Sequence, residues 1–192
     1  SMTVLVQTEV AERLAAKGDM HALAWKTSVM KDERGELRGE FRDTPWCNGV
    51  LWPMCSLPNL PGEVTDFKWK LGKEAVDKRF AAAYPNGVDG EYLDSAEMEP
   101  ASLDFDRRHF AAADAPLVFS SVTKKPGVYT GLVWSEYTRD IARRVHDKGR
   151  FMMANCTPDR YAWISSYMDV LGTESIWINR NTGAWMPPNY EW

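Results

Sequence analysis

Apolar positions follow two different repeats along the chain, one typical of helices and one typical of strands. Val6, Val10 and Leu14 recur every four residues and predict a helix that ends near Gly18. Shorter, nearly continuous apolar runs predict buried strands between such helices. The predicted helices cover residues 4–17, 73–83, 131–148 and 158–167, and the predicted strands cover residues 21–29, 89–94, 151–156 and 168–174.

Strands that alternate with helices are typical of an α/β fold with a parallel sheet and right-handed crossovers. The segments FMMA at 151–154 and MDVL at 168–171 are nearly all apolar, as expected for strands that are covered on both faces. Long connections over 31–73 and 95–129 separate the elements, and the second contains one short extended stretch, APLVFSS. Connections of this length inside a domain are usually functional. We therefore expect one α/β domain over residues 1–192.

The composition argues against two classes of binding partner, nucleic acids and membranes. The 192 residues include 44% hydrophobic residues and carry a formal net charge of −4, which is ordinary for a soluble globular domain and argues against a nucleic-acid partner. No apolar run reaches the roughly 18–20 residues that a membrane span needs, so we expect no membrane partner. Ser1-Met2 reads as a tag remnant before a start methionine, which fits both a cytoplasmic protein and an exported protein whose signal has been removed.

Metal and cofactor signals are weak in this sequence. Cys47, Cys55 and Cys156 form no C-x-x-C motif, and the three histidines are scattered, so we predict no metal site. No Gly-rich phosphate loop follows a predicted strand, so we predict no nucleotide cofactor. Free thiols and a single Cys47–Cys55 disulfide fit the sequence equally well.

Polar residues stand at or just past the C-terminal ends of three predicted strands. Asp94 ends the first of these strands, Asn155 lies at the end of the next, and Glu174 ends the last. The C-terminal ends of parallel strands carry the chemistry both in (β/α)8 barrels and in open α/β sheets. The sequence therefore predicts that Asp94, Asn155 and Glu174 lie on one rim of the sheet.

Three segments, in this order, carry a resemblance to a known family: DGEYLDS at 89–95, GRFMMANCTP at 149–158 and MDVLGTE at 168–174. Residues 87–174 resemble the middle of poorly characterised bacterial (β/α)8-barrel proteins related to glycoside hydrolases. The resemblance implies a TIM-type barrel that cleaves a carbohydrate. Such barrels need about 250 residues, and only four βα units are predicted here. We therefore expect a partial or half barrel, either completed by a second copy in a homodimer or belonging to a longer protein.

The resemblance also implies roles for particular residues. Glycosidic cleavage uses two carboxyl groups, one as proton donor and the other as nucleophile or base. Asp94 is the expected nucleophile or base and Glu174 the expected general acid, with Glu97 as an alternative for either role. The expected substrate-binding residues are Asn155, Tyr92, which shares a strand face with Asp94, and the two tryptophans Trp46 and Trp52 of the first long connection.

Each of these residues also has a structural explanation. Asp94 can simply cap the following turn, Glu174 can be a surface carboxylate, and a tryptophan is most often a core residue. The sequence therefore leaves a second function open, in which the chain is a non-catalytic carbohydrate-binding module or a structural barrel fragment.

Overall fold

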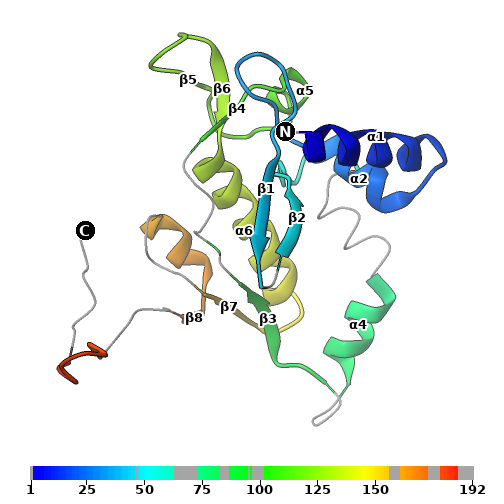
Figure 1. The fold of residues 1–192 in the computed structure, drawn as a ribbon. Coiled ribbons are helices and arrows are strands. Elements are labelled where there is room, and N and C mark those ends of the chain that lie inside the picture. The colour runs from blue at the N-terminus through cyan, green and yellow to red at the C-terminus, as the bar shows by residue number, and fades with distance from the viewer. Residues whose placement is uncertain are drawn as a thin grey trace.

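The computed structural model describes residues 2–45, 47–62, 73–82, 87–94, 96, 102–155, 161–172 and 178–185. The helices are α1 (Met2–Ala16), α2 (Met20–Ser28), α4 (Lys73–Ala81), α5 (Arg107–Phe110), α6 (Thr130–His146) and the 3-10 helix η1 (Ala162–Tyr167). The strands are β1 (Glu40–Thr44), β2 (Cys47–Leu51), β3 (Gly90–Leu93), β4 (Leu103–Asp104), β5 (Val118–Phe119), β6 (Pro126–Tyr129), β7 (Phe151–Ala154) and β8 (Val170–Leu171) (Figure 1).

The described strands form three sheets. β3, β7 and β8 form a parallel sheet with β7 in the middle, as the α/β prediction requires. β1 and β2 form an antiparallel hairpin, and β4, β6 and β5 form a second antiparallel sheet. The expectation of one wholly parallel sheet is therefore wrong, and within the described residues none of the three sheets closes into a barrel.

Residues 21–29 form most of helix α2, so the strand predicted there is wrong. Asp19 precedes this helix, and its carboxylate accepts a hydrogen bond of 2.9 Å from the backbone N–H of Ala22, which is an N-cap. Ala22, Trp25 and Ser28 are buried at a spacing of three residues, which matches one helix face. The cap and the helical spacing outweigh the short apolar run that suggested a strand.

Both long connections contain strands that were not predicted as such. β1 and β2 lie in the first connection and pair from Glu40 opposite Leu51 to Thr44 opposite Cys47. The second connection contains β4, β5, β6 and α5, and its extended stretch APLVFSS does form β5. Within the described residues, the helix expected over 158–167 is the 3-10 helix η1, and the strand expected over 168–174 is the two-residue strand β8.

Helix α6 joins two hydrophobic cores and lies at the centre of the molecule (Figure 1). Its N-terminal half contributes Val133 to the first core, and its C-terminal half packs under the parallel sheet through Ile141 and Val145. The first core consists of Met30, Cys55, Leu57, Leu60, Ala112, Val128 and Val133, and the second of Phe80, Leu93, Ala96, Ile141, Ala142, Val145, Met152 and Ala154.

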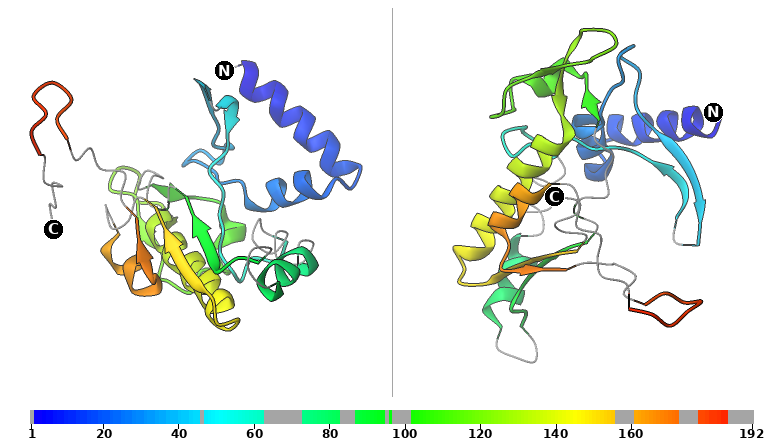
Figure 2. Two further views of the ribbon diagram at one scale, coloured as in Figure 1. Left: turned by 90° about the horizontal axis from the view of Figure 1, so that it is seen from below. Right: turned by 90° about the vertical axis from the view of Figure 1, so that its left-hand side faces the viewer.

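Within the described residues, one face of the parallel sheet is covered and the other is largely exposed, so the expectation of two covered faces is wrong. Met152 and Ala154 of β7 are fully buried, whereas Phe151 is 62% exposed and Met153 is 37% exposed. Tyr92 lies opposite Met153 in the strand register and is also exposed. The open face therefore combines apolar side chains from neighbouring strands, and Figure 2 shows the arrangement of these strands.

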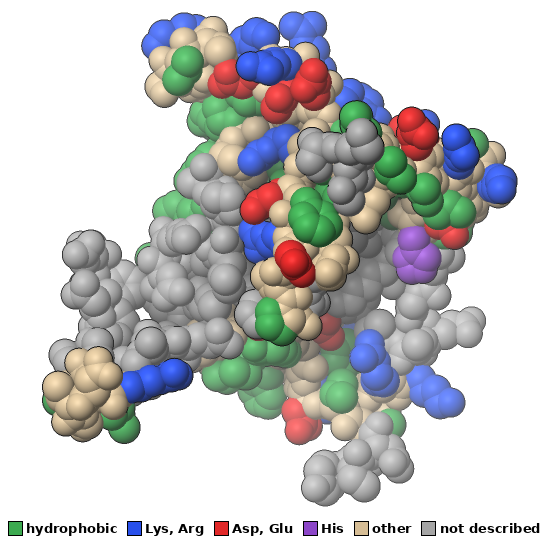
Figure 3. All heavy atoms as spheres, in the orientation of Figure 1, with side chains coloured by type: hydrophobic (Ala, Val, Ile, Leu, Met, Phe, Trp, Pro, Cys, Tyr) green, Lys and Arg blue, Asp and Glu red, His purple; other side chains and the backbone are tan. Residues whose placement is uncertain are grey.

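Helices α1 and α2 pack against each other and project to one side of the molecule (Figure 2). The helix predicted over 4–17 is confirmed, but its apolar stripe of Val6, Val10 and Leu14 remains largely exposed (Figure 3). Among the described residues, no helix is both long and apolar enough to cross a membrane.

Candidate functional site

Asp94 and Asn155 meet at the C-terminal edge of the parallel sheet. Leu93 pairs with Ala154 at the ends of β3 and β7, so the residues that follow these strands are neighbours. The side-chain amide of Asn155 donates a hydrogen bond of 3.2 Å to Asp94 Oδ1, and the Tyr92 hydroxyl donates one of 3.1 Å to the same oxygen. The prediction that Asp94 and Asn155 share one rim is confirmed, and Tyr92 joins them as expected. We call these three residues the rim cluster.

The backbone fixes the turn that carries Asp94. The N–H of Asn155 donates to the carbonyl of Leu93 at 2.8 Å, and the N–H of Ala96 donates to the carbonyl of Asn155 at 3.1 Å. The residues on both sides of Asp94 are thus tied to Asn155, which is itself buried. This arrangement orients an exposed carboxylate on a rigid strand end.

The rim cluster gathers hydrogen-bonding groups at one exposed position. Asp94 Oδ1 accepts hydrogen bonds from the Asn155 amide and the Tyr92 hydroxyl. An exposed carboxylate beside an amide and a phenol can accept hydrogen bonds from the hydroxyl groups of a ligand. It can also act as a base or a nucleophile.

Several predicted site residues lie outside the described part of the chain. These residues are Trp46, Glu97 and Glu174. The last described position before Glu174 is Gly172, whose N–H donates to the carbonyl of Ala154 at 2.8 Å. The chain after β8 therefore reaches the same edge of the sheet as Asn155, two residues before Glu174.

Trp52 lies in a different part of the molecule from the rim cluster. Its ring packs edge-on against Trp25 with 5.4 Å between ring centroids. It lines a pocket of about 220 Å³ between the segment after β2 and the N-terminal half of α6, and no residue of the rim cluster lines that pocket. The structure therefore does not bring Trp52 together with Asp94.

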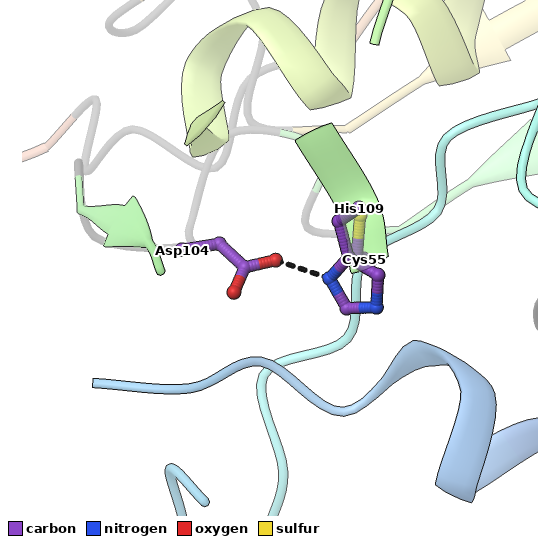
Figure 4. A group of neighbouring side chains, drawn as sticks. All are labelled: Cys55, Asp104 and His109. Carbon is purple, nitrogen blue, oxygen red and sulfur yellow. Dashed lines mark hydrogen bonds and ion pairs between the residues drawn. The ribbon is translucent and has the colours of Figure 1, made fainter. Parts of the chain in front are cut away.

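A buried cluster of Cys55, Asp104 and His109 was not predicted from the sequence (Figure 4). His109 Nδ1 lies 2.5 Å from Asp104 Oδ2, and His109 Nε2 lies 2.8 Å from the carbonyl oxygen of Thr27. A carboxylate and a carbonyl only accept hydrogen bonds, so the geometry calls for an imidazolium with a proton on each nitrogen. Burial lowers the pKa of His109, but the hydrogen bond and the charge of Asp104 outweigh it and raise the pKa above its usual value.

A short helix brings His109 back onto Asp104. Asp106 caps α5 by accepting from the N–H of Arg108 at 3.0 Å, and its carboxylate also pairs with the Arg108 guanidinium. Burial opposes ionisation of Asp106, but the hydrogen bonds from Arg108 hold its pKa well below the usual range. The sequence signal was the capping Asp106 within DFDRRHF, yet the spacing of Asp104 and His109 alone does not show that they meet.

The geometry of this cluster fits an ion pair better than a metal centre. The ligand atoms of Cys55, Asp104 and His109 lie within 4.8 Å of one another. In a tetrahedral site with bonds of about 2.0 Å, neighbouring ligand atoms lie about 3.3 Å apart. The Asp104 oxygen and the His109 nitrogen are closer than that and share a proton, and the second ring nitrogen is bound to Thr27. Cys55 is buried and forms no disulfide, so the Cys47–Cys55 disulfide that the sequence allowed does not form.

Comparisons of this chain with family models, with curated proteins and with solved structures found no match.

Proposed function

We propose that the rim cluster is the carbohydrate site of a glycoside hydrolase-like protein, with Asp94 as nucleophile or base and Glu174 as general acid. The observation that supports this proposal is the exposed Asp94 carboxylate, oriented by Tyr92 and Asn155 at the C-terminal edge of a parallel sheet. In α/β proteins this edge is the usual place for chemistry. Glu97 remains the alternative second carboxylate.

In this proposal each residue of the rim cluster has a separate role in glycosidic cleavage. Asp94 serves as the nucleophile or base beside the second carboxyl group. Asn155 and Tyr92 fix the rotamer of Asp94 and offer polar atoms to sugar hydroxyl groups. A separation of about 5–5.5 Å between the two carboxyl groups would give retention of configuration, and about 6.5–9.5 Å would give inversion.

The proposal treats the chain as part of a TIM-type barrel. The parallel sheet has three described strands, whereas about eight are needed to close a barrel around its side chains. Its exposed face would then belong to the barrel interior, completed by a second copy of the chain or by a longer protein. The alternative function is a non-catalytic carbohydrate-binding module, which is favoured by the exposed aromatic ring of Tyr92 beside the polar Asp94 and Asn155.

Substitution at Asp94 tests the catalytic proposal. Turnover of a panel of chromogenic glycosides is measured for the parent, Asp94→Asn and the control Asp89→Asn, which removes an exposed carboxylate before the start of β3. We expect Asp94→Asn to lower turnover about 10²–10⁴-fold at an unchanged melting temperature, because a neutral amide is neither base nor nucleophile. The control should keep parental turnover.

Two outcomes would count against catalysis at Asp94. Equal losses in both variants would show that the change is not specific to this end of the strand. A parent that turns over no glycoside but binds sugars by calorimetry, with binding weakened by Asn155→Ala, would favour the binding-module alternative.

A further inference from the structure

The pocket that Trp52 lines is built from three segments that meet beside the first core. Met30 comes from the chain after α2, residues 52–56 follow β2, and α6 supplies its N-terminal half. The cavity measures about 220 Å³, which exceeds the roughly 150 Å³ of an apolar protein cavity known to hold benzene. A single substituted ring therefore fits this space. The lining residues are Met30, Trp52, Pro53, Met54, Ser56, Thr130, Val133, Trp134 and Tyr137.

Among the described residues, the lining is largely aromatic and carries no charge. Trp52, Trp134 and Tyr137 supply ring surfaces, and two methionines supply thioethers, which make favourable contacts with aromatic rings. None of the nine lining residues is Asp, Glu, Lys, Arg or His, so a charged ligand would lose its hydration without gaining a partner. The pocket therefore selects a neutral ligand.

The ring walls are held in place before any ligand binds. Trp52 packs edge-on against Trp25, and Trp134 packs edge-on against Tyr137 with 5.2 Å between centroids and 88° between planes. A methyl group added at Gly39 would lie 2.8 Å from an atom of the Trp52 ring, so the backbone also confines this indole. Because these side chains are already ordered, less side-chain conformational entropy is lost when a ligand binds.

Few polar side-chain groups belong to the described lining of this pocket. Within the described residues, the Trp52 and Trp134 indole N–H groups and the Ser56 hydroxyl make no hydrogen bond to protein. The Thr130 hydroxyl is already paired with Ser102. Such a small set of polar groups suits one or two acceptor oxygens, whereas a pyranose brings several hydroxyl groups that would stay unpaired against apolar walls.

We infer that this pocket binds a neutral aromatic ring that carries one or two hydrogen-bond acceptor oxygens. The ring would lie among the Trp52, Trp134 and Tyr137 side chains, and the oxygen would accept from an indole N–H or from the Ser56 hydroxyl. This site is separate from the rim cluster and does not depend on the proposed function.

Three matched probes test the ligand class. Acetophenone is a neutral ring with one acceptor oxygen, benzoate has a similar shape with a negative charge, and methyl β-glucopyranoside is a neutral pyranose. Binding is measured by saturation-transfer NMR and by calorimetry on the full chain. We expect acetophenone to bind with a Kd of about 1 mM or tighter and each of the other two probes to bind at least about 10-fold more weakly. Absence of acetophenone binding, or equal or tighter binding of benzoate or the glucoside, would overturn the inference.

Variants locate the binding on the protein. Trp52→Ala should weaken acetophenone binding at least about 10-fold, while the control Trp163→Ala, which removes an exposed indole that does not line the pocket, should leave it unchanged. If Trp52→Ala fails to fold, two other variants replace it: Ser56→Ala removes a hydroxyl, and Trp134→Phe removes the indole N–H but keeps an aromatic ring. At least one of these two variants should weaken binding, and parental binding in both would contradict the inference. Loss of binding in Trp163→Ala alone would contradict the assignment. Asp94→Asn should bind acetophenone like the parent, which separates this test from that of the rim cluster.

Discussion

At the scale of single residues, His109 shows how a buried charge is held in this molecule. Its two ring nitrogens face the Asp104 carboxylate and the Thr27 carbonyl, and these partners come from β4 and the end of α2. Asp104 also accepts from the backbone N–H groups of Lys31 and Asp106, so its second oxygen is satisfied as well. The hydrogen bonds to the buried Asp104 carboxylate offset part of the hydration free energy that this group loses on burial. The Asp104–His109 pair can therefore link β4, α5 and the end of α2.

The His109 pair makes stability depend on pH. The titratable groups that face the ring are Asp104, Asp106 and the Cys55 thiol, and Lys31 lies beside the two carboxylates. The pKa of His109 is raised in the folded protein, so the pair contributes its full stability below about pH 6.5, the pKa of an unfolded histidine. That contribution should be lost as the pH rises through the folded pKa. We therefore expect the free energy of unfolding in urea to fall as the pH is raised above 6.5.

A double variant provides the control for this prediction. Asp104→Asn with His109→Gln removes both charges and should flatten the pH dependence over this range, whereas His21→Asn, which changes an exposed histidine, should keep it. The NMR signals of the His109 ring give a second measurement that needs no variant. A His109 titration midpoint below that of a model peptide would contradict the prediction.

At the scale of elements, the sequence predicted best where a local repeat is long. The helix predicted over 131–148 was confirmed as α6. Its apolar residues repeat with the helical period over about four turns, which is too long a repeat to be mistaken for a strand. β3 and β7 were also predicted, because each is a short apolar run followed by a polar residue. That same pattern placed Asp94 and Asn155 on one rim, so this part of the candidate site followed from the sequence.

Other elements depend on contacts between distant residues, which no local pattern reveals. β4 and β8 are two-residue strands that form by pairing with β6 and β7, which lie elsewhere along the chain. The meeting of Asp104 with His109 depends on the capped turn of α5 and on the end of α2. These features could not be predicted without the three-dimensional pairing.

The N-cap of α2, which the strand prediction overlooked, can be tested directly. Asp19→Ala removes the acceptor for the Ala22 N–H and should lower the free energy of unfolding by about 1 kcal/mol. The melting temperature should then fall by about 2–4 °C. Asp19→Asn keeps a capping oxygen and should remain close to the parent. Equal losses in both variants would show that the charge, not the cap, stabilises this helix.

At the scale of the whole molecule, α6 is the element that connects the parts. One half of it packs into the core shared with the antiparallel sheet, and the other half packs under the parallel sheet. The outer face of the parallel sheet is left open, and the stripe along α1 is a second exposed apolar surface. Large exposed apolar surfaces are unusual on stable monomers. The molecule therefore offers two surfaces that a second copy could cover.

We predict that two copies associate through the parallel sheet. Tyr92, Phe151, Met153 and Val170 line its open face, and the paired strands leave β3 and β8 as edges within the described sheet. Covering such a face removes apolar surface from water, and a second copy could also continue the sheet at an edge. Light scattering at micromolar concentration should give about twice the chain mass of 21.8 kDa. Phe151→Lys should shift the protein to monomer, because it places a charge in the centre of the contact.

Two variants outside the sheet face decide whether that shift is specific. Phe119→Lys changes a phenylalanine on β5 that is 67% exposed, close to the exposure of Phe151, and should leave the dimer intact. Val10→Lys places a charge in the α1 stripe and should leave it intact as well. Dissociation by Val10→Lys with no effect of Phe151→Lys would move the interface to α1. A parent that stays at the mass of one chain and unfolds in a single transition would show that the open face needs no second copy, and the half-barrel interpretation would then fail while the rim cluster around Asp94 could still function within one chain.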